Sequence, residues 1–304
     1  MEEYVGRLAP SPTGALHLGN ARTFMVAYLR ARSAGGRLIM RMEDLDHPRD
    51  KPGAAAQAVE DLKWLGFEWD EEYVQSERRG IYRRALQKLC DAGLAYPCIC
   101  SRRDVEGAQS APHEGEQLFY PGTCRGRFAS WEEACAALPP GRLPCWRFRA
   151  APGEVAFDDA FAGRFSQDVA ATLGDFPLAR DAGGAGYTLA SVVDDADMGV
   201  TEVVRGDDLI AATPAHILVQ RALGLCTPRY CHVPLVVGRD GHRLAKRHGD
   251  TRIASYRTSG ASPEALVGML AASCGWAKAG EKVALSALVG RFDLSTIPRS
   301  PFMV

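Results

Sequence analysis

The sequence predicts an α/β protein built on a doubly wound parallel sheet, with an inserted subdomain and a short helical C-terminal region. Apolar segments of strand and helix periodicity alternate over residues 1–96, which is typical of parallel sheets with right-handed crossovers. This alternation stops in residues 97–185, where Cys, Pro and Gly are frequent, and it returns in residues 186–250. Residues 251–304 have a mainly helical pattern. These four ranges are the predicted domain organisation.

Within the first range, two strands and three helices are expected in the order strand, loop, helix, strand, helix, helix, and the short apolar start of the chain is the first strand. The segment RLIMRMED alternates its side chains as a strand does. Apolar residues recur at helical spacing in three segments, and a glycine follows each of them. The expected helices cover residues 20–34, 57–65 and 81–92.

The second half of the chain contains three strand candidates and two helix starts. The strand candidates are GYTLASVVDD, GVTEVVRGDDL and YCHVPLVVG. Thr213-Pro214 is expected to open a helix that ends near Gly224, and Ser262-Pro263 to open another that Gly275 closes.

Bulk composition excludes several classes of protein. With 304 residues, 46% of them hydrophobic, the chain can bury a substantial core and is not intrinsically disordered. There is no signal peptide and no apolar window of membrane-spanning length, so we expect a cytoplasmic protein without a membrane partner. A net charge of -1 means that any surface for RNA is a local patch. No protein partner is implied.

The segment RLAPSPTGALHLGN is the first candidate site, because a proline-rich loop here leads into a helix. A helix N-terminus offers unpaired N–H groups and the positive end of a dipole, which together suit a phosphate. Gly14 and Gly19 would let a ligand approach the backbone, and His17 would donate a hydrogen bond to a phosphoryl oxygen. The alternative is an ordinary surface histidine beside a helix cap.

Several motifs then point to one family. His17-Leu18-Gly19-Asn20 resembles the His-Ile-Gly-His signature of class I aminoacyl-tRNA synthetases. RLAPSPTG, RMEDLD, KWLGFEWDE, QSER, GYTLASVVDD and VVRGDD resemble motifs of the glutamyl branch, in the order of that branch, over roughly residues 5 to 275. The resemblance implies a Rossmann-like fold of class I synthetase type, with ATP and Mg²⁺ used at His17, Gly19 and Asn20.

A second nucleotide motif of the class is Lys-Met-Ser-Lys-Ser. The matching stretch is Arg243-Leu244-Ala245-Lys246-Arg247, in which Lys246 is kept while an arginine and an alanine replace two motif residues. The resemblance implies that Arg243 and Lys246 bind ATP, and that Lys246 and His17 stabilise its phosphates as catalytic residues. The alternative is a solvated basic loop. Six basic residues between Arg239 and Arg257 also form a candidate patch for RNA phosphates.

The same resemblance implies a glutamate pocket. Two carboxylates require cationic partners, and an ammonium requires an anionic one. Arg205 and Arg7 are expected to bind the carboxylates, Glu43 the amino group, and Tyr187 to shape the pocket. Glu43 follows a predicted strand, where ligands bind in open α/β sheets. The glutamate-binding set that the resemblance implies is Arg7, Ala9, Ser11, Glu43, Tyr187 and Arg205.

Nine cysteines without a signal peptide indicate reduced thiols or metal ligands. Cys98, Cys100 and Cys124 have the spacing of three ligands of a structural Zn²⁺, although three buried thiols would give the same pattern. Zinc chemistry alone would take the fourth ligand from His113, Glu114 or Glu116. The family resemblance instead implies Tyr120, with His113 as the rival. The other six cysteines are expected to be packing residues.

The resemblance implies a two-step reaction, in which L-glutamate is activated by ATP and then transferred to tRNA. About fifty residues follow Arg252, which we expect to be too few for an anticodon-binding domain. In this respect the chain resembles the short members of the branch that attach glutamate to the queuosine base of tRNA(Asp). The alternatives are a short enzyme that charges the 3' end of tRNA(Glu), and a tRNA-binding paralogue without catalysis.

Overall fold

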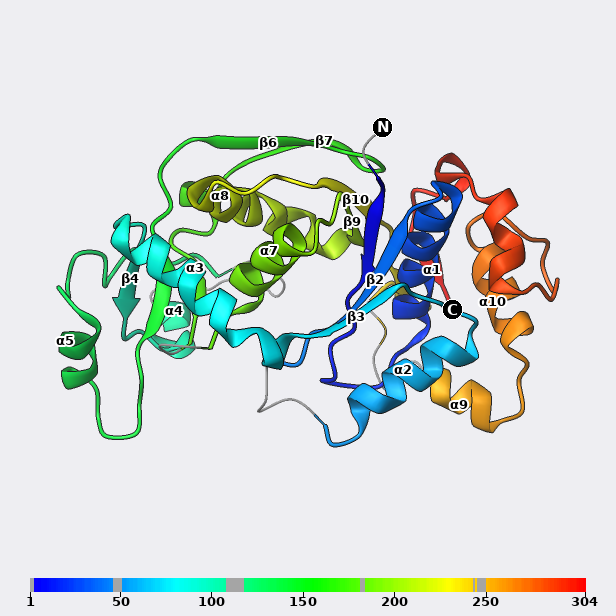
Figure 1. Ribbon diagram of the computed structural model, residues 1–304, viewed down its shortest axis with the longest axis horizontal. Coiled ribbons are helices and arrows are strands. Elements are labelled where there is room, and N and C mark those ends of the chain that lie inside the picture. Colours follow the sequence, from blue (N-terminus) through cyan, green and yellow to red (C-terminus); the bar gives the residue numbers. More distant parts are fainter. Residues whose placement is uncertain (1–2, 46–50, 108–117, 181–183, 243, 245–249) are drawn as a thin grey trace.

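The computed structural model describes residues 3–45, 51–107, 118–180, 184–242, 244 and 250–304. Two groups of strands, parallel in every pair but one, form its centre (Figure 1). In the first, β1 (Val5–Leu8), β2 (Arg37–Met42) and β3 (Glu71–Val74) pair in that order. In the second, the order is β7-β6-β10-β9, and the members are β6 (Glu154–Asp159), β7 (Gly163–Asp168), β9 (Glu202–Gly206) and β10 (Arg229–Val233). The predicted α/β class is confirmed.

The two groups meet where β1 lies beside β9. The amide of Thr201 donates a hydrogen bond of 2.9 Å to the carbonyl of Val5 at this junction. From β1 the chain builds outward through β2 and β3, whereas from β9 it builds outward through β10 on the other side. The strand order therefore reverses between β1 and β9, and ligands of open α/β sheets bind at the carboxyl ends of strands at such a point.

Helices cover both faces of the first sheet. The alternation predicted for β2 is confirmed, since Leu38 and Met40 pack in one core cluster and Ile39 in another. The first cluster includes α1, and the second includes α3, α7 and α8. The helices have the bounds α1 (Leu18–Ser33), α2 (Ala54–Trp64), α3 (Arg79–Asp91), α7 (Tyr187–Asp197) and α8 (Thr213–Leu223).

The prediction for GYTLASVVDD was wrong, because this segment forms helix α7 and not a strand. Every residue from Leu189 to Asp195 is buried, so the apolar residues do not mark one face and the helical period is hidden. The β-branched pair Val192-Val193 then favours a strand on propensity alone. As a consequence, Tyr187 starts a helix, and two aspartates at its other end point into the protein interior.

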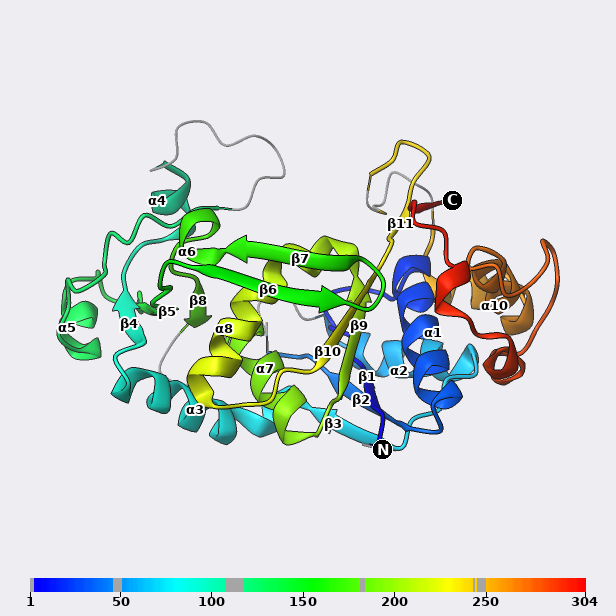
Figure 2. The same cartoon turned by 90° about the horizontal axis from the view of Figure 1, so that it is seen from above.

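The middle of the chain divides between two places (Figure 2). The hairpin of β6 and β7 extends the sheet of β9 and β10. A separate antiparallel sheet has the order β4-β5-β8. Its strands are β4 (Ala95–Cys98), β5 (Cys145–Phe148) and β8 (Pro177–Ala179), and three short helices accompany them: α4 (Arg102–Gly107), α5 (Trp131–Ala136) and α6 (Val169–Thr172).

The expected helical pattern after residue 250 is present. Helices α9 (Ile253–Thr258) and α10 (Pro263–Ala272) follow one another, and the Ser262 hydroxyl caps α10 as predicted. Short 3-10 turns cover Gln75–Arg78, Asp207–Ala212, Leu285–Arg291 and Leu294–Thr296. The last strand, β12 (Phe302–Met303), pairs with β11 (Val236–Val237).

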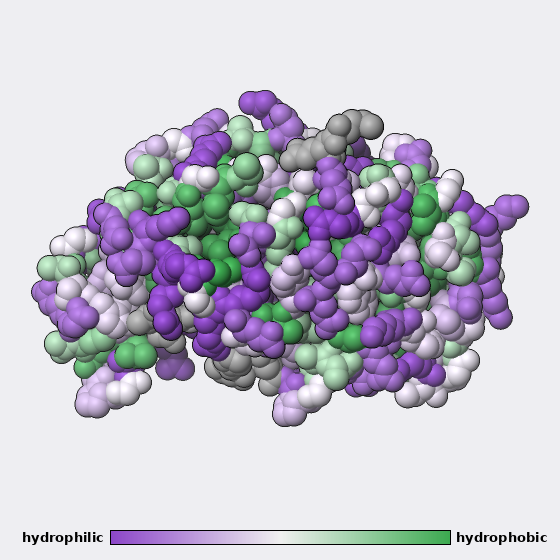
Figure 3. All heavy atoms as spheres, viewed as in Figure 1, coloured by the Kyte–Doolittle hydropathy of each residue, from purple (hydrophilic) through white to green (hydrophobic). Residues whose placement is uncertain are grey.

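Hydrophilic residues cover most of the face seen in Figure 3, and hydrophobic residues gather between them in patches. Over the described parts of the chain, every helix is too short or too polar to cross a lipid bilayer.

Candidate active site

A cluster of buried charges lies at the point where the strand order reverses. Arg41 of β2 is fully buried, and its Nη1 donates a hydrogen bond of 2.6 Å to Asp195 Oδ1 at the end of α7. Its Nη2 donates one of 3.0 Å to Glu43 Oε1. Arg7 Nε, on β1, lies 3.7 Å from the same Asp195 oxygen. Arg7 Nη1 donates a hydrogen bond of 2.9 Å to the carbonyl of Val204 on β9. We call this group, with Arg205 described below, the arginine cluster.

The charges of the arginine cluster set the protonation of its acids. Burial raises the pKa of Asp195, but Arg41 and then Arg7 outweigh burial and leave the pKa below its usual value. Asp195 is therefore an anion between two arginines. Burial also raises the pKa of Glu43, and there Arg41 and Arg7 only partly oppose the effect. A cation bound next to Glu43 would stabilise its charged form.

Sequence analysis placed Arg7 and Glu43 in the glutamate pocket but missed Arg41 and Asp195. A signal was available for Arg41, because a lone arginine in an otherwise apolar strand must find a buried anion. For Asp195 the sequence offered no such signal, because its segment was expected to be a strand and not the helix α7. The structure brings Arg7, Glu43, Tyr187 and Arg205 to the same end of the sheet, with Ala9 half-buried and Ser11 exposed on the loop after β1.

Arg205 and Tyr187 form the second side of the site. Arg205, on β9, is 5% exposed, and its Nη1 donates a hydrogen bond of 3.2 Å to the hydroxyl of Tyr187. Its Nη2 donates 2.8 Å to the Thr213 hydroxyl. Tyr187 is 44% exposed, so the Nη1 end of the guanidinium is the end nearest solvent. This arrangement can present a fixed cation to an anionic ligand.

His216 of α8 packs edge-on against Tyr187, with ring centroids 5.5 Å apart. Its Nδ1 lies 2.9 Å from the carbonyl of Ala212 and donates to it. Among the residues that the structure describes, its buried Nε2 has no hydrogen-bond partner. Burial, assisted by the charge of Arg205, lowers the pKa of His216 to about 3. The imidazole is therefore neutral.

His17 is itself the N-cap of α1. Its Nδ1 accepts a hydrogen bond of 3.1 Å from the amide of Gly19, and its own amide donates 3.1 Å to Asn20 Oδ1. Because Nδ1 accepts, the ring proton lies on Nε2, which can donate to another group. A Cβ at Gly19 would meet the His17 ring at 2.9 Å, so this glycine is required by the cap as well as by any ligand. Around Gly14 a Cβ would have open space.

The loop of His17 pairs with the chain that follows the basic segment. The amide of Leu18 donates 3.0 Å to the carbonyl of Thr251, and the amide of Ile253 donates 2.9 Å to that of Leu16. Leu244 packs against the core cluster that contains α1. Arg243, Lys246 and Arg247 lie outside the described residues. Two arginines of the predicted RNA patch are ion-paired, Arg252 with Asp250 and Arg257 with Glu60.

Three cysteines meet as the spacing predicted. The sulfur atoms of Cys98, Cys100 and Cys124 all lie within 4.8 Å of one another. The Tyr120 hydroxyl lies 3.2 Å from the Cys98 sulfur and 3.8 Å from the Cys100 sulfur, and it accepts 2.8 Å from the Cys124 amide. Three thiols and a phenol around one point form a donor set suited to Zn²⁺. His113, the rival ligand, lies outside the described residues. We call this group the cysteine cluster.

Two neighbours of the cysteine cluster were not anticipated. Cys145 lies directly opposite Cys98 in the pairing of β4 with β5, so the expectation that it only packs was wrong. Hydrogen bonding from the Cys145 thiol, with help from Tyr120 and Arg147, holds the pKa of Cys98 well below its usual value. Arg147 donates 3.2 Å to the Cys98 sulfur and lies over the Tyr120 ring. Cys226 is exposed, which also differs from the packing role expected for it.

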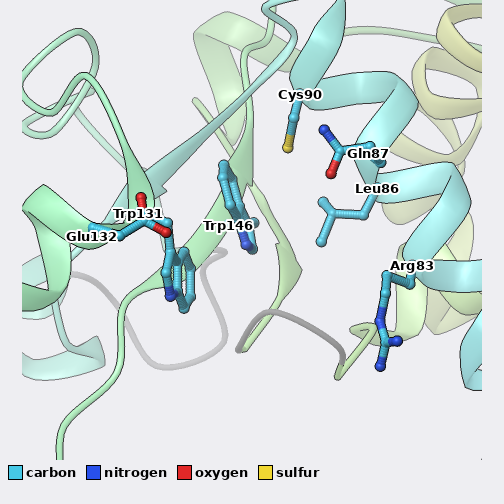
Figure 4. Close-up of a pocket in the computed structure, with 7 residues that line it drawn as sticks. All are labelled: Arg83, Leu86, Gln87, Cys90, Trp131, Glu132 and Trp146. Atoms are coloured by element: carbon cyan, nitrogen blue, oxygen red, sulfur yellow. The ribbon is translucent and has the colours of Figure 1, made fainter.

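A pocket of about 330 Å³ is lined by residues that belong to neither cluster (Figure 4). One face of α3 and the stacked rings of Trp131 and Trp146, whose centroids are 5.1 Å apart, line it. It contains none of the residues predicted for the site, and we assign it no role.

The chain is similar to known proteins of one family. The family model described as "tRNA synthetases class I (E and Q), catalytic domain" matches residues 3–291. A glutamyl-Q tRNA(Asp) synthetase of Rhodopirellula baltica is 47% identical, over 100% of this chain and 97% of that protein. One of Symbiobacterium thermophilum is 48% identical, over 98% and 95%.

Among solved structures, the chain is similar to a glutamate tRNA ligase of Elizabethkingia meningosepticum in complex with its amino acid. The TM-score is 0.83 and the sequence identity 29%, over 99% of this chain and 67% of that one.

Proposed function

The chain belongs to the class I tRNA synthetases for glutamate and glutamine, and from this premise we propose that it joins glutamate to queuosine in tRNA(Asp). In the first step the α-carboxylate of L-glutamate attacks the α-phosphorus of ATP, and pyrophosphate leaves. In the second, a hydroxyl oxygen of the queuosine base attacks the glutamyl carbonyl, its proton passes to solvent, and AMP leaves. Because the carboxylate is already ionised at neutral pH, the first step requires no general base.

The arginine cluster is the observation that carries this proposal. Arg205 and Arg7 are buried cations that suit the two carboxylates of glutamate, and Glu43 suits its ammonium group. Tyr187, hydrogen-bonded to Arg205, orients the side-chain carboxylate. Ala9 and Ser11 line the approach from the loop after β1. Glutamine would bring only one carboxylate to the two arginines and is expected to bind more weakly.

ATP binding is assigned to the N-terminus of α1. His17, Gly19 and Asn20 form the cap of this helix, where backbone dipoles favour phosphate. Arg243 and Lys246 complete the phosphate contacts, together with Mg²⁺. His17 Nε2 and Lys246 would stabilise negative charge on the phosphoryl oxygens in the transition state. Positioning and charge stabilisation are therefore the whole of the catalysis assigned to this chain.

Zinc is assigned to the cysteine cluster, with Cys98, Cys100, Cys124 and Tyr120 as ligands. Its role is structural, because four protein ligands leave no open position on a tetrahedral ion.

The acceptor is proposed on similarity to relatives that carry the name glutamyl-Q tRNA(Asp) synthetase, along almost the full length of each. The test supplies labelled glutamate and ATP with tRNA(Asp) that carries queuosine, tRNA(Asp) that lacks it, and queuosine-bearing tRNA(Asp) without its 3'-terminal adenosine. We expect labelling of the first and third only. Labelling that requires the terminal adenosine would instead identify a synthetase that charges the 3' end. Absence of glutamate-dependent exchange between pyrophosphate and ATP would identify a binding protein without catalysis.

A further inference from the structure

We propose that Asp159 and His232 are positioning residues for Arg205, and that they hold its guanidinium toward the amino-acid pocket by fixing the tautomer of the His232 imidazole. This inference rests on the proposed function, since it assigns Arg205 to glutamate. It concerns two residues that touch neither substrate, one of which belongs to the hairpin of β6 and β7.

The three side chains form a continuous buried relay. Arg205 Nε donates a hydrogen bond of 3.0 Å to His232 Nε2, and His232 Nδ1 lies 2.6 Å from Asp159 Oδ2. The side chains of His232 and Asp159 are 0% exposed, and Arg205 is 5% exposed. Arg205 lies on β9, His232 on β10 and Asp159 on β6. The relay therefore crosses the second sheet from β9, at its end, to β6 of the hairpin.

The chemistry of the two ends determines where the imidazole proton lies. A guanidinium N–H only donates, so His232 Nε2 must accept and Nδ1 must carry the proton. Asp159 is the matching acceptor. It also accepts hydrogen bonds from the backbone amides of His232, Phe161 and Ala162, at 3.0, 3.0 and 2.8 Å. Burial raises the pKa of Asp159, but the hydrogen bonds from His232 and these amides outweigh it, so the carboxylate stays charged.

The hydrogen bond to His232, together with the one to Thr213, fixes the orientation of the Arg205 guanidinium. Nη2 is occupied by the Thr213 hydroxyl at 2.8 Å, and Nε by His232, so Nη1 is directed at Tyr187 and solvent. Without an acceptor at Nε, the guanidinium would keep only the contacts at its far end and could rotate about them. Aromatic rings exclude water from the relay, since Tyr230 stacks on His232 at 6.0 Å and Phe157 lies 6.2 Å from it. No solvent molecule can therefore replace a lost acceptor easily.

Asp159→Asn tests the relay because it separates positioning from folding. The asparagine oxygen can still accept from the backbone amides, but its amide group faces His232 Nδ1 as a donor. The imidazole must then move its proton to Nε2, where it faces the N–H of Arg205. Thr213 can accept the Nε2 proton, yet Arg205 Nε still loses its acceptor. A similar tautomer change explains the effect of the equivalent substitution in serine proteases.

We expect the KM for glutamate in pyrophosphate exchange to rise about 10-fold to 100-fold, the usual effect of losing a hydrogen bond to a charged group. The KM for ATP and the melting temperature should be nearly unchanged. The ¹⁵N shifts of His232 should report the Nδ1–H tautomer in the wild type and the Nε2–H tautomer in Asp159→Asn.

Two further variants make the test specific. His232→Gln offers a carbonyl to Arg205 and an amide to Asp159, so it should retain more glutamate affinity than His232→Leu, which offers neither. Asp158→Asn is the matched control, because this neighbouring side chain is 80% exposed and lies 3.7 Å from Arg164 only as a surface pair. It should leave the KM for glutamate unchanged.

Three results would overturn the relay. The first is an Nε2–H tautomer in the wild type. The second is an unchanged KM for glutamate in Asp159→Asn although the tautomer has moved. The third is a parallel loss of glutamate affinity, ATP affinity and melting temperature, which would indicate a purely structural role. A wild type without glutamate-dependent exchange would contradict the proposed function instead, and the ¹⁵N measurement would still decide the tautomer.

Discussion

The arginine cluster and the cysteine cluster bury charge in opposite ways. Arg41 has carboxylate oxygens of Asp195, Glu43 and Asp194 at 2.6, 3.0 and 3.8 Å, so its charge is balanced within the protein. The cysteine cluster gathers three thiols and a phenol, with Arg147 as the cation bonded to Cys98. The first cluster thus balances its charges before a ligand arrives, whereas the second is a set of donor atoms suited to a metal ion.

The largest expected effect is loss of the metal. In Cys98→Ser, or after a strong chelator removes zinc, the small core around Tyr96, Val105 and Tyr120 should lose its order, because metal binding supplies the folding energy of such sites. Hydrogen exchange of residues 96–107 and 118–124 should increase strongly, and elemental analysis should show the loss of one zinc per chain. Glutamate-dependent exchange should change less than about 3-fold, since the arginine cluster does not depend on the metal.

Cys226→Ser is the control, because this thiol is exposed and distant in sequence from the cluster. Absence of zinc from carefully purified wild type would remove the metal from this comparison.

Arg41→Met should give the next largest effect. It leaves Asp195, Asp194 and Glu43 without their shared cation, and removing one partner of a buried ion pair costs about 3–5 kcal/mol. Urea unfolding should show a loss of that size. Arg291→Ala breaks a partly exposed pair with Glu281 and should have a much smaller effect, because solvent screens this pair. Equal losses in the two variants would mean that the arginine cluster is not a preformed network.

Arg205→Ala should affect ligand binding more than stability. Loss of a charge-assisted contact costs about 1.5–3 kcal/mol, so glutamate affinity should fall about 10-fold to 150-fold. ATP affinity should change little, because the α1 N-terminus is built from other residues. Titration calorimetry with each ligand measures both. The control is Arg229→Ala, a 71% exposed arginine on the adjacent strand. Equal weakening of glutamate and ATP would contradict the role of Arg205.

The smallest expected effect comes from the pH dependence of stability. Burial lowers the pKa of His216 to about 3 from 6.5, so between these values the unfolded chain binds more protons than the folded one. The stability that depends on neutral His216 is fully present above pH 6.5 and is lost as the pH falls from 6.5 toward 3. Between pH 7 and pH 5.5 it amounts to about 1 kcal/mol. Over the same pH range, the free energy of unfolding should therefore fall by about 1 kcal/mol less in His216→Gln than in the wild type. An identical pH dependence in the two proteins would show that His216 is not buried as a neutral base.

The two clusters also differ in how well a sequence predicts them. Cys98, Cys100 and Cys124 lie within 27 consecutive residues, so their spacing is a local pattern that predicts a metal site, and the family resemblance added Tyr120. The roles of Cys145 and Arg147 were missed, because strand pairing brings β5 beside Cys98.

The arginine cluster depends on strands and helices that are far apart in the chain. The family motifs identified Arg7, Glu43, Tyr187 and Arg205, and the structure brings these residues together. Asp195, Asp159 and His232 could not be found in this way, because their partners are set by the strand order and by helix α7. Because α7 is buried on all sides, its sequence lacks helical periodicity and was predicted as a strand. Periodicity therefore could not predict that its two aspartates are buried.

The most direct test of the central claim is a crystal structure of the protein with a non-hydrolysable glutamyl-adenylate analogue. The account predicts the glutamyl side-chain carboxylate against Arg205 and Tyr187, the amino group against Glu43, and the phosphate at the cap formed by His17 and Gly19. An analogue bound elsewhere, with the arginine cluster and the α1 N-terminus both left without ligand, would contradict it.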